Sequence, residues 1–347
     1  MTRETAFVQA EQTAHAASAS SAAVTETILS VSDLKVAFPV TAGVLRRKVG
    51  EVRAVDGISF DILRGETFGL VGESGCGKST VARTILRLGD ATSGHIWFNG
   101  EDLTALDDVR MRPVRRNISM IFQDPYGSLD PRQRAGDIVM EPMRNFDLGL
   151  SRQQMEQRVR ELLELVGLDP AYVDRVPHEF SGGQRQRLVI ARALSTNPSF
   201  IVCDEAISAL DVSIQAQVIN LLEDLQQELG LTYLFIAHDL SVVRHISDRV
   251  AVMYLGQIVE IAGWQALYDR PLHPYTQALL EAVPVPDPVV EKQRARRIIS
   301  GEVPSPMQRP SGCAFSSRCP LRTAECEKGV PALREMEPGH QVACYRL

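Results

Sequence analysis

The residues best suited to chemistry form one stretch, Gly72-Glu73-Ser74-Gly75-Cys76-Gly77-Lys78-Ser79-Thr80, which has the spacing of a phosphate-binding loop. Thr67–Val71 before it predicts a short buried strand, and residues 80–88 after it predict a helix, which is the order that this motif requires. Its glycines allow backbone N–H groups to face the α- and β-phosphates of a nucleotide, and the helix N-terminus adds positive potential. An ordinary glycine-rich turn is the alternative, but it does not explain the Lys-Ser pair. The predicted nucleotide-binding residues are Gly72, Ser74, Gly75, Cys76, Gly77, Lys78, Ser79 and Thr80.

Three further apolar runs end in polar residues that suit phosphate chemistry. Residues 118–122 lead to Gln123, residues 200–203 lead to Asp204 and Glu205, and residues 233–237 lead to His238. In open parallel sheets, ligands bind beyond the carboxyl ends of the strands. We therefore predict that these four residues converge with the phosphate-binding loop on one site.

Phosphoryl transfer needs positioning, charge neutralisation and an oriented nucleophile, and these needs predict a role for each residue. Lys78 reaches the β- and γ-phosphates, while Ser79 and, through water, Asp204 hold Mg²⁺. Glu205 orients or deprotonates the attacking water, and Gln123 contacts both that water and Mg²⁺. His238 donates to a γ-phosphate oxygen; the alternative is a histidine satisfied at a strand end.

Two other features carry both a functional and a structural interpretation. Ser181 and Gln184 have the spacing of a capping box, which predicts a helix start at Ser181. Gly182 and Gly183 weaken that start by up to ~1 kcal/mol each, yet they leave backbone N–H groups bare for an anion. A plain helix cap is the alternative, and it leaves the two glycines unexplained. Phe38 is equally consistent with stacking on adenine and with a core aromatic on an edge strand.

Composition and charge limit the class of protein. The chain has 347 residues, of which 44% are hydrophobic and 23% charged, as in an ordinary globular protein with one large domain and an appendage. Its net charge of −6 does not favour nucleic acid as the main partner. No apolar run approaches the ~20 residues that cross a bilayer, and the N-terminus lacks the layout of a secretory signal, so we expect any membrane role to be peripheral.

The pattern along the chain predicts three regions. Residues 1–27 read as a disordered tail, and residues 28–262 as an α/β domain with a helical subdomain at about 124–190. Within that subdomain, the apolar spacing of residues 153–166 predicts an amphipathic helix. Residues 263–347 form an extension that carries four of the six cysteines, Cys313, Cys319, Cys326 and Cys344. In a cytosolic protein these four suggest a metal before disulfides. Their number suits Zn²⁺ or a [4Fe–4S] cluster, and the ligand rule alone leaves cluster, zinc and no metal open.

Taken together, the phosphate-binding loop, Ser181–Gln184, Asp204-Glu205, residues 208–211 and His238 resemble the ATP-binding-cassette (ABC) ATPases, although Phe180 stands where many members carry Leu. Phe38-Pro39, His273-Pro274-Tyr275-Thr276 and Gly312-Cys313…Arg318-Cys319-Pro320 look like the ATP-binding subunits of oligopeptide/dipeptide importers, and more like the second, F-type one. This resemblance covers nearly the whole chain after residue 28.

The resemblance implies an α/β P-loop NTPase fold with a RecA-like parallel sheet, an antiparallel β subdomain and a helical subdomain that carries Ser181. It also implies a head-to-tail dimer with a second ABC ATPase subunit, either a related D-type subunit or a second copy. ATP and Mg²⁺ on one chain are then covered by Ser181, Gly182, Gly183 and Gln184 of the other, and Asp211 lies at the seam.

The same resemblance implies two membrane permease subunits as partners, one of which inserts a short helix near Gln123, and a solute-binding protein acting indirectly. The chain is then peripheral on the cytoplasmic face of the inner membrane. For the four cysteines the resemblance favours the cluster over zinc. We expect its role to be structural, so that loss of Cys319 loosens the tail and leaves ATP binding intact.

Two other classes of function compete with an importer motor. A non-transport ABC ATPase acting on ribosomes or DNA usually has two cassettes or a long coiled coil, and only one phosphate-binding loop occurs here. A P-loop kinase or switch GTPase has no use for Ser181–Gln184.

Overall fold

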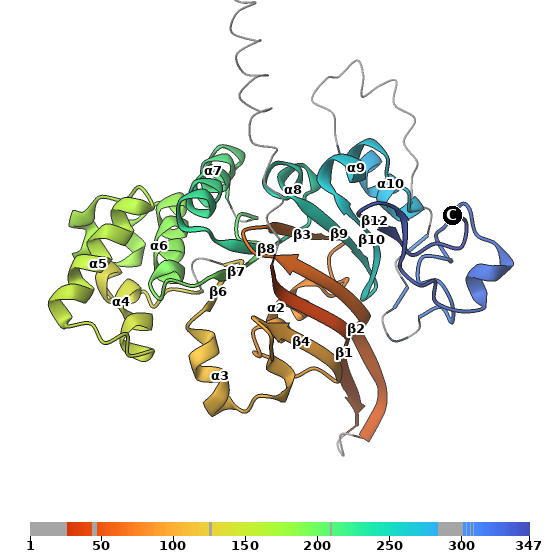
Figure 1. The fold of residues 1–347 in the computed structure, drawn as a ribbon, viewed down its shortest axis with the longest axis horizontal. Helices are drawn as coiled ribbons and strands as arrows, with labels where there is room; N and C mark the ends of the chain where they lie inside the picture. Colours follow the sequence, from red (N-terminus) through yellow and green to blue (C-terminus); the bar gives the residue numbers. More distant parts are fainter. Residues whose placement is uncertain are drawn as a thin grey trace, which may run out of the picture.

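The computed structural model describes residues 26–43, 47–124, 127–208, 210–283, 301–302, 304–305, 307 and 309–347. The predicted disordered tail, residues 1–27, lies outside this range except for its last two residues. Figure 1 shows a central sheet with a helical group at one end of the molecule and the C-terminal residues at the other.

The central sheet is parallel in its middle and antiparallel at one edge. Its described strands are, in spatial order, β11 (Arg334–Glu337), β12 (His340–Val342), β10 (Gln257–Gly263), β9 (Arg249–Tyr254), β3 (Thr67–Val71), β8 (Thr232–Ala237), β7 (Phe200–Asp204) and β6 (Ile118–Ile121). The five strands from β9 to β6 run parallel, and every residue of β3, β7 and β8 is buried. Such continuous apolar runs are typical of parallel strands that are covered on both faces. The predicted strand at residues 67–71 is confirmed without a shift.

Helices follow the parallel strands as the sequence predicts. α2 (Lys78–Ile85) follows β3, α7 (Val212–Leu229) connects β7 to β8, and α8 (Leu240–Ile246) connects β8 to β9. These βα connections place the polar residues at the strand ends on one edge of the sheet.

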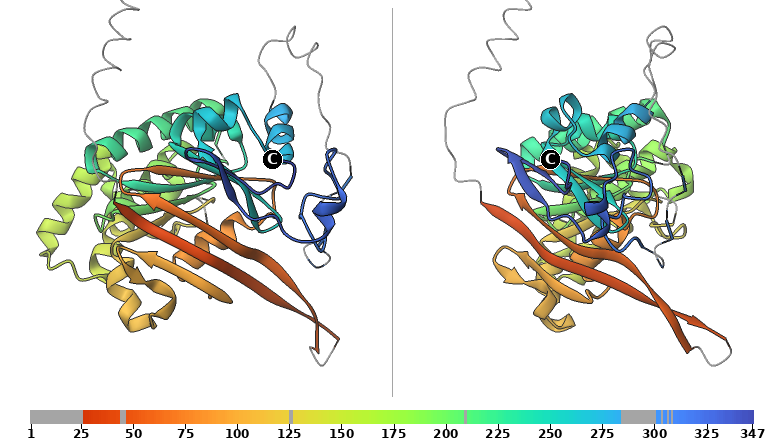
Figure 2. Two further views of the ribbon diagram at one scale, coloured as in Figure 1. Left: turned by 45° about the vertical axis from the view of Figure 1, so that its right-hand side comes forward. Right: turned by 90° about the vertical axis from the view of Figure 1, so that its right-hand side faces the viewer.

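A second, antiparallel sheet covers one face of the parallel sheet. Its order is β2 (Arg47–Leu63), β1 (Thr27–Ala42), β4 (Ser93–Phe98) and β5 (Glu101–Asp102), and η1 (Leu103–Ala105) and α3 (Asp108–Arg115) follow. Phe60 of β2 stacks on Phe68 of β3 with ring centroids 5.1 Å apart. The long β1–β2 hairpin projects beyond the rest of the sheet in both views of Figure 2.

The helical group is built from α4 (Ala135–Asn145), α5 (Arg152–Leu165), η2 (Pro170–Asp174), η3 (Pro177–Glu179) and α6 (Gly182–Leu194). The helix predicted at residues 153–166 is present as α5, one residue earlier at each end. The predicted capping box at Ser181 is confirmed, since Ser181 Oγ accepts from the N–H of Gln184 and Gln184 Oε1 accepts from the N–H of Ser181.

The C-terminal residues join the main sheet, which the sequence pattern does not predict. After α9 (Trp264–Asp269), α10 (Pro274–Ala282) and η4 (Ala324–Glu327), strand β12 joins the main sheet beside β10. Glu260 of β10, fully buried, accepts from His340 Nε2 of β12 at 2.7 Å and from the N–H groups of Leu272 and His273 at 2.8 and 3.0 Å. Among the described residues, no helix combines the length and the apolar character needed to cross a bilayer.

Candidate functional site

The phosphate-binding loop has a backbone that only glycine allows at two of its positions. A Cβ on Gly72 would lie 2.1 Å from the carbonyl oxygen of Met253, and a Cβ on Gly77 would lie 2.3 Å from that of Ala54. Gly77 has a φ of 114° and is the N-cap of α2. The loop is therefore held against β2 and β9 by close backbone contacts, and the N-terminus of α2 faces it.

Lys78 and Ser79 take up positions at this loop. The Lys78 side chain is buried, and its Nζ donates to the carbonyl oxygens of Gly72 at 2.7 Å and Glu73 at 3.1 Å. Ser79 Oγ donates to Asp204 Oδ1 at 2.9 Å. The pKa of Asp204 lies above its ordinary value because the carboxyl is buried, and the hydrogen bond from Ser79 offsets only part of this rise. A divalent cation at this hydroxyl and carboxylate would offset the cost of burying the Asp204 charge.

The strand-end residues converge as the sequence predicts. Gln123 Nε2 donates to Glu205 Oε2 at 2.7 Å, and His238 Nδ1 lies 3.8 Å from the same oxygen. Glu205 has a φ of 48°, a left-handed conformation that is uncommon for a residue with a side chain. Its carbonyl oxygen accepts from the N–H and the hydroxyl of Ser208, and its N–H donates to Ile236 of β8. These bonds hold the strained backbone and aim the Glu205 carboxylate at Gln123 and His238.

Gln123, Glu205 and the phosphate-binding loop border one cavity of about 260 Å³, whereas Asp204 and His238 are not among its lining residues. Its lining comprises Ser74–Thr80 of the phosphate-binding loop, Gln123, Glu205, Val52–Ala54, Leu255, Gly256 and Arg309. The size and the mixture of backbone N–H groups, a lysine and a carboxylate suit a phosphate-bearing ligand. Phe38 is not among the lining residues; it is half exposed on β1, paired in register with Val52, which does line the cavity.

The Ser181 segment and Asp211 do not line this cavity. A Cβ on Gly183 would lie 2.7 Å from Ile214 Cγ2 of α7, so close helix packing explains that glycine, whereas one on Gly182 would meet only an ordinary contact at 3.8 Å. Asp211 caps α7 by accepting from the N–H of Ile214 at 3.0 Å, and this bond holds the pKa of Asp211 below its ordinary value. Within their own chain, Ser181 and Asp211 thus act as helix caps. Gly183 allows α6 to pack closely against α7.

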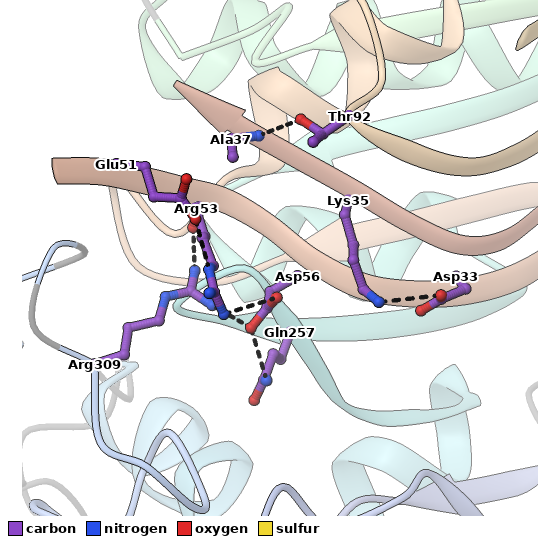
Figure 3. A network of polar contacts seen from close by, with 9 residues as sticks. All are labelled: Asp33, Lys35, Ala37, Glu51, Arg53, Asp56, Thr92, Gln257 and Arg309. Atoms are coloured by element: carbon purple, nitrogen blue, oxygen red, sulfur yellow. Dashed lines mark hydrogen bonds and ion pairs between the residues drawn. The ribbon is translucent and has the colours of Figure 1, made fainter. Parts of the chain in front are cut away.

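Arg309 is a cavity residue that the sequence reasoning missed. It belongs to the C-terminal residues, and Figure 3 shows it beneath β2, where Nη1 donates to Asp56 Oδ2 at 2.9 Å and Nη2 donates to the carbonyl oxygen of Arg53. Nη2 lies over Gly256, where a Cβ would approach it to 2.5 Å. A lone arginine in a segment between prolines gives no sequence signal of such a contact.

The four C-terminal cysteines are free thiols with mutual electrostatic effects. Burial, together with the neighbouring Cys326, Cys319 and Cys344, raises the pKa of Cys313 to about 11. Their donor set matches that of a thiolate metal site, but no group of three or more His, Cys, Asp or Glu side chains among the described residues has an arrangement that could hold a metal ion.

A second, mostly apolar groove of about 360 Å³ lies between the helical group and the parallel sheet. It is lined by residues of β6, α4 and α6, by the last residue of α3 and by the turn after α2, and it includes the exposed side chains of Leu88 and Phe122. Phe122 directly precedes Gln123, so the groove adjoins the cavity through one chain segment.

Comparison with known proteins identifies the family. A profile described as "ABC transporter" matches residues 55–208, and one described as "Oligopeptide/dipeptide transporter, C-terminal region" matches residues 259–326. The oligopeptide transport ATP-binding protein AppF of Bacillus subtilis (strain 168) is 55% identical, with 92% of this chain and 97% of AppF covered. OppF of Escherichia coli (strain K12) is 51% identical, with 92% of this chain and 96% of OppF covered.

Solved structures agree with the sequence comparison. The dimeric ATP-binding cassette MJ0796, in a post-hydrolysis state bound to ADP and Pi, superposes with a TM-score of 0.61 at 27% identity, covering 68% of this chain and 98% of that one. CbiO1 from Clostridium perfringens gives a TM-score of 0.61 at 26% identity, covering 71% and 92%. The predicted P-loop NTPase fold and the predicted resemblance are both confirmed. This chain belongs to the ABC transporter ATP-binding proteins of the oligopeptide/dipeptide type.

Proposed function

We propose that the chain is the ATP-hydrolysing motor subunit of an importer for oligopeptides, dipeptides or a similar solute. The observation that carries this proposal is one cavity lined by the phosphate-binding loop, Gln123 and Glu205. Asp204 adjoins it through Ser79, and His238 through Glu205. The oligopeptide transport names of relatives at 50–55% identity support the class of solute.

Each residue of the candidate site has its own role in ATP hydrolysis. The backbone of the loop and Lys78 bind the phosphates, and Ser79, Asp204 and Gln123 hold Mg²⁺, which neutralises the charge that builds on the phosphate oxygens. Glu205 orients and deprotonates the attacking water, and His238 contacts the γ-phosphate. Phe38, on the strand next to Val52, stacks on adenine.

The second half of each ATP site comes from a partner cassette. Ser181, Gly182, Gly183 and Gln184 do not line the cavity of their own chain, which supports a role on the opposite chain. Asp211 then lies at the seam, beside Val212, whose side chain is 81% exposed. The partner is a D-type subunit or a second copy, and the dimeric structure of MJ0796 supports the cassette pair.

The apolar groove beside Gln123 suits a short helix from a permease subunit. Exposed Leu88 and Phe122 offer it an apolar surface, and closure of the cassettes then moves the helix and with it the permease. Two permeases, an indirect solute-binding protein and a peripheral position on the cytoplasmic face of the inner membrane complete the assembly.

For the extension, we propose that Cys313, Cys319, Cys326 and Cys344 hold a [4Fe–4S] cluster, with Zn²⁺ as the alternative. In support, all four thiols are free. Neighbouring cysteines also contribute to the raised pKa values of Cys313, Cys319 and Cys344. The ligand arrangement is not preformed among the described residues, so binding has to draw the thiols together.

The ATPase assignment is tested by Glu205→Gln, with Glu228→Gln, an exposed carboxylate of α7, as the matched control. Losing a positioned general base costs about 10²–10⁴-fold in rate, so we expect Glu205→Gln to lose turnover by this factor and to keep ATP binding. Phosphate release and ATP binding are measured side by side. Wild-type turnover in a folded Glu205→Gln protein would remove Glu205 from this role.

The cluster is tested by metal analysis of protein purified without oxygen. A [4Fe–4S] site predicts a brown protein with about four irons per chain, and Cys319→Ser should bleach it. Stoichiometric zinc in a colourless preparation, or no metal at all, would exclude the cluster. Neither result affects the ATPase assignment, which rests on the cavity.

A further inference from the structure

The C-terminal extension contacts the phosphate-binding loop directly through Arg318. Nη1 of Arg318 lies 3.0 and 3.3 Å from the two carboxylate oxygens of Glu73, the second residue of the loop, and 3.4 Å from the hydroxyl of Tyr254. The Arg318 side chain is only 8% exposed and that of Glu73 is 27% exposed. This is a half-buried ion pair between two segments that lie 245 positions apart in the sequence.

The loop that carries Arg318 is anchored in the core. Phe315, three positions earlier, is 1% exposed and lies among Tyr254, Tyr275 and His273, with ring centroids 5.3, 5.4 and 5.8 Å away. Tyr275 also reaches the phosphate-binding loop, because its hydroxyl accepts from the N–H of Glu73 at 3.0 Å. Arg318 therefore approaches Glu73 from a fixed base rather than as a free surface side chain.

The anchored segment runs between two of the free thiols. Cys313 and Cys319 stand at its two ends, and the N–H of Cys313 donates to the carbonyl oxygen of Cys326 at 2.8 Å. Gly312 allows this close passage, since a Cβ there would lie 2.1 Å from the same oxygen. A group that fixes the positions of Cys313 and Cys319 therefore also fixes the segment between them, which carries Arg318.

The charge at this contact matters for a phosphate ligand. Glu73 places a carboxylate in the loop that binds the phosphates, and its carbonyl oxygen accepts from Nζ of Lys78. An uncompensated carboxylate in this position repels a triphosphate and competes for Lys78, and the repulsion is strong where water is partly excluded. Arg318 supplies the compensating charge.

We propose that Arg318 is a positioning residue for ATP binding: it neutralises Glu73 and fixes the phosphate-binding loop from the C-terminal extension of the same chain. Arg309 in the cavity wall gives the extension a second contact with this site. The proposal rests on the proposed ATP-binding function. It differs from the sequence-based expectation that loosening the extension at Cys319 leaves ATP binding intact.

The test compares ATP dissociation constants in Arg318→Gln, Glu73→Gln and the double variant. Arg318→Gln leaves the Glu73 carboxylate bare, so we expect affinity to fall by roughly fivefold or more, within the usual range of coupling between sites. Glu73→Gln should bind ATP at least as tightly as wild type. The double variant should return to nearly wild-type affinity, a rescue that a purely structural role of Arg318 would not give.

Arg322→Gln is the matched control. Arg322 lies in the same extension and pairs with Glu327 on the surface. It should bind ATP as wild type does. A raised ionic strength should shrink the defect of Arg318→Gln, because salt screens the bare carboxylate.

Hydrogen exchange supplies a second readout, since coupling between two sites is reciprocal. ATP should slow exchange in residues 313–319 of the wild type and not in Arg318→Gln. Unchanged ATP affinity in Arg318→Gln, or no rescue by Glu73→Gln in folded protein, would overturn the proposal. The ATPase assignment would stand in either case, because the Glu205→Gln experiment tests it separately.

Discussion

Four polar residues of the candidate site take their positions from one simple rule of sheet structure. Gln123, Asp204, Glu205 and His238 each follow a parallel strand, and such strands end at one edge of the sheet. Arg309 and Arg318 follow no such rule, because their acidic partners, Asp56 and Glu73, lie more than two hundred positions away and the contact depends on how the extension folds back. Gly183 belongs between these cases: its motif was visible, but its packing against Ile214 was not.

His273 gives a prediction for pH. Burial lowers the pKa of His273 from its ordinary value near 6.5 to about 4, and its Nδ1 accepts from the N–H of Tyr275 at 3.1 Å, as a neutral ring does. The unfolded chain therefore takes up a proton below pH 6.5 that the folded chain refuses until about pH 4. We expect the free energy of unfolding to fall across this window by up to about 3 kcal/mol from this group.

The measurement is denaturant unfolding between pH 7 and pH 4, in wild type and in His273→Asn. Asn can still cap α10 but does not titrate, so the variant should be less stable throughout and show a shallower loss of stability with falling pH. Parallel pH profiles for the two proteins would contradict a buried neutral His273.

At the scale of helices and strands, the sequence succeeded where a pattern is local. β3, α5 and the helix start at Ser181 were predicted to within one residue, because an apolar run, a helical spacing and a capping box each signal their own structure. β11 and β12 were missed. Arg334-Glu335-Met336-Glu337 is largely exposed and has no apolar alternation, and β12 is held by pairing with distant β10.

His340 ties β12 to the buried carboxylate of Glu260 in β10. Replacing it by Leu removes one of the donors to the fully buried carboxylate of Glu260. Leaving a buried acceptor short of a partner costs about 1–3 kcal/mol, and we expect thermal unfolding to shift accordingly.

His178→Leu, at an exposed position of η3, is the control for replacing histidine by leucine. A melting temperature of His340→Leu equal to that of the control would mean that β12 is not fixed by this bond. ATP binding measured on the same samples reports whether loosening β12 reaches the phosphate-binding loop.

The whole molecule carries two different surfaces for binding nucleotide, and they lie apart on the same chain. The cavity carries Lys78 and Glu205, while Ser181 and its glycines belong to the helical group at the end of the molecule opposite the C-terminal extension. A head-to-tail pair of cassettes would join the two surfaces. The sequence reached this arrangement only through the family resemblance, since spacing along one chain carries no information about a second chain.

The most direct test of this account mixes two inactive proteins. Lys78→Ala chains lack phosphate binding, and Ser181→Arg chains lack the covering segment. In a mixed dimer one composite site loses both groups and the other keeps both, so ATP hydrolysis should return above the level of either variant alone. If the chain pairs only with a D-type subunit, the two substitutions are divided between the partners. Recovery of hydrolysis is the result we predict; no recovery when mixing of the chains is proven would contradict a site built from two cassettes.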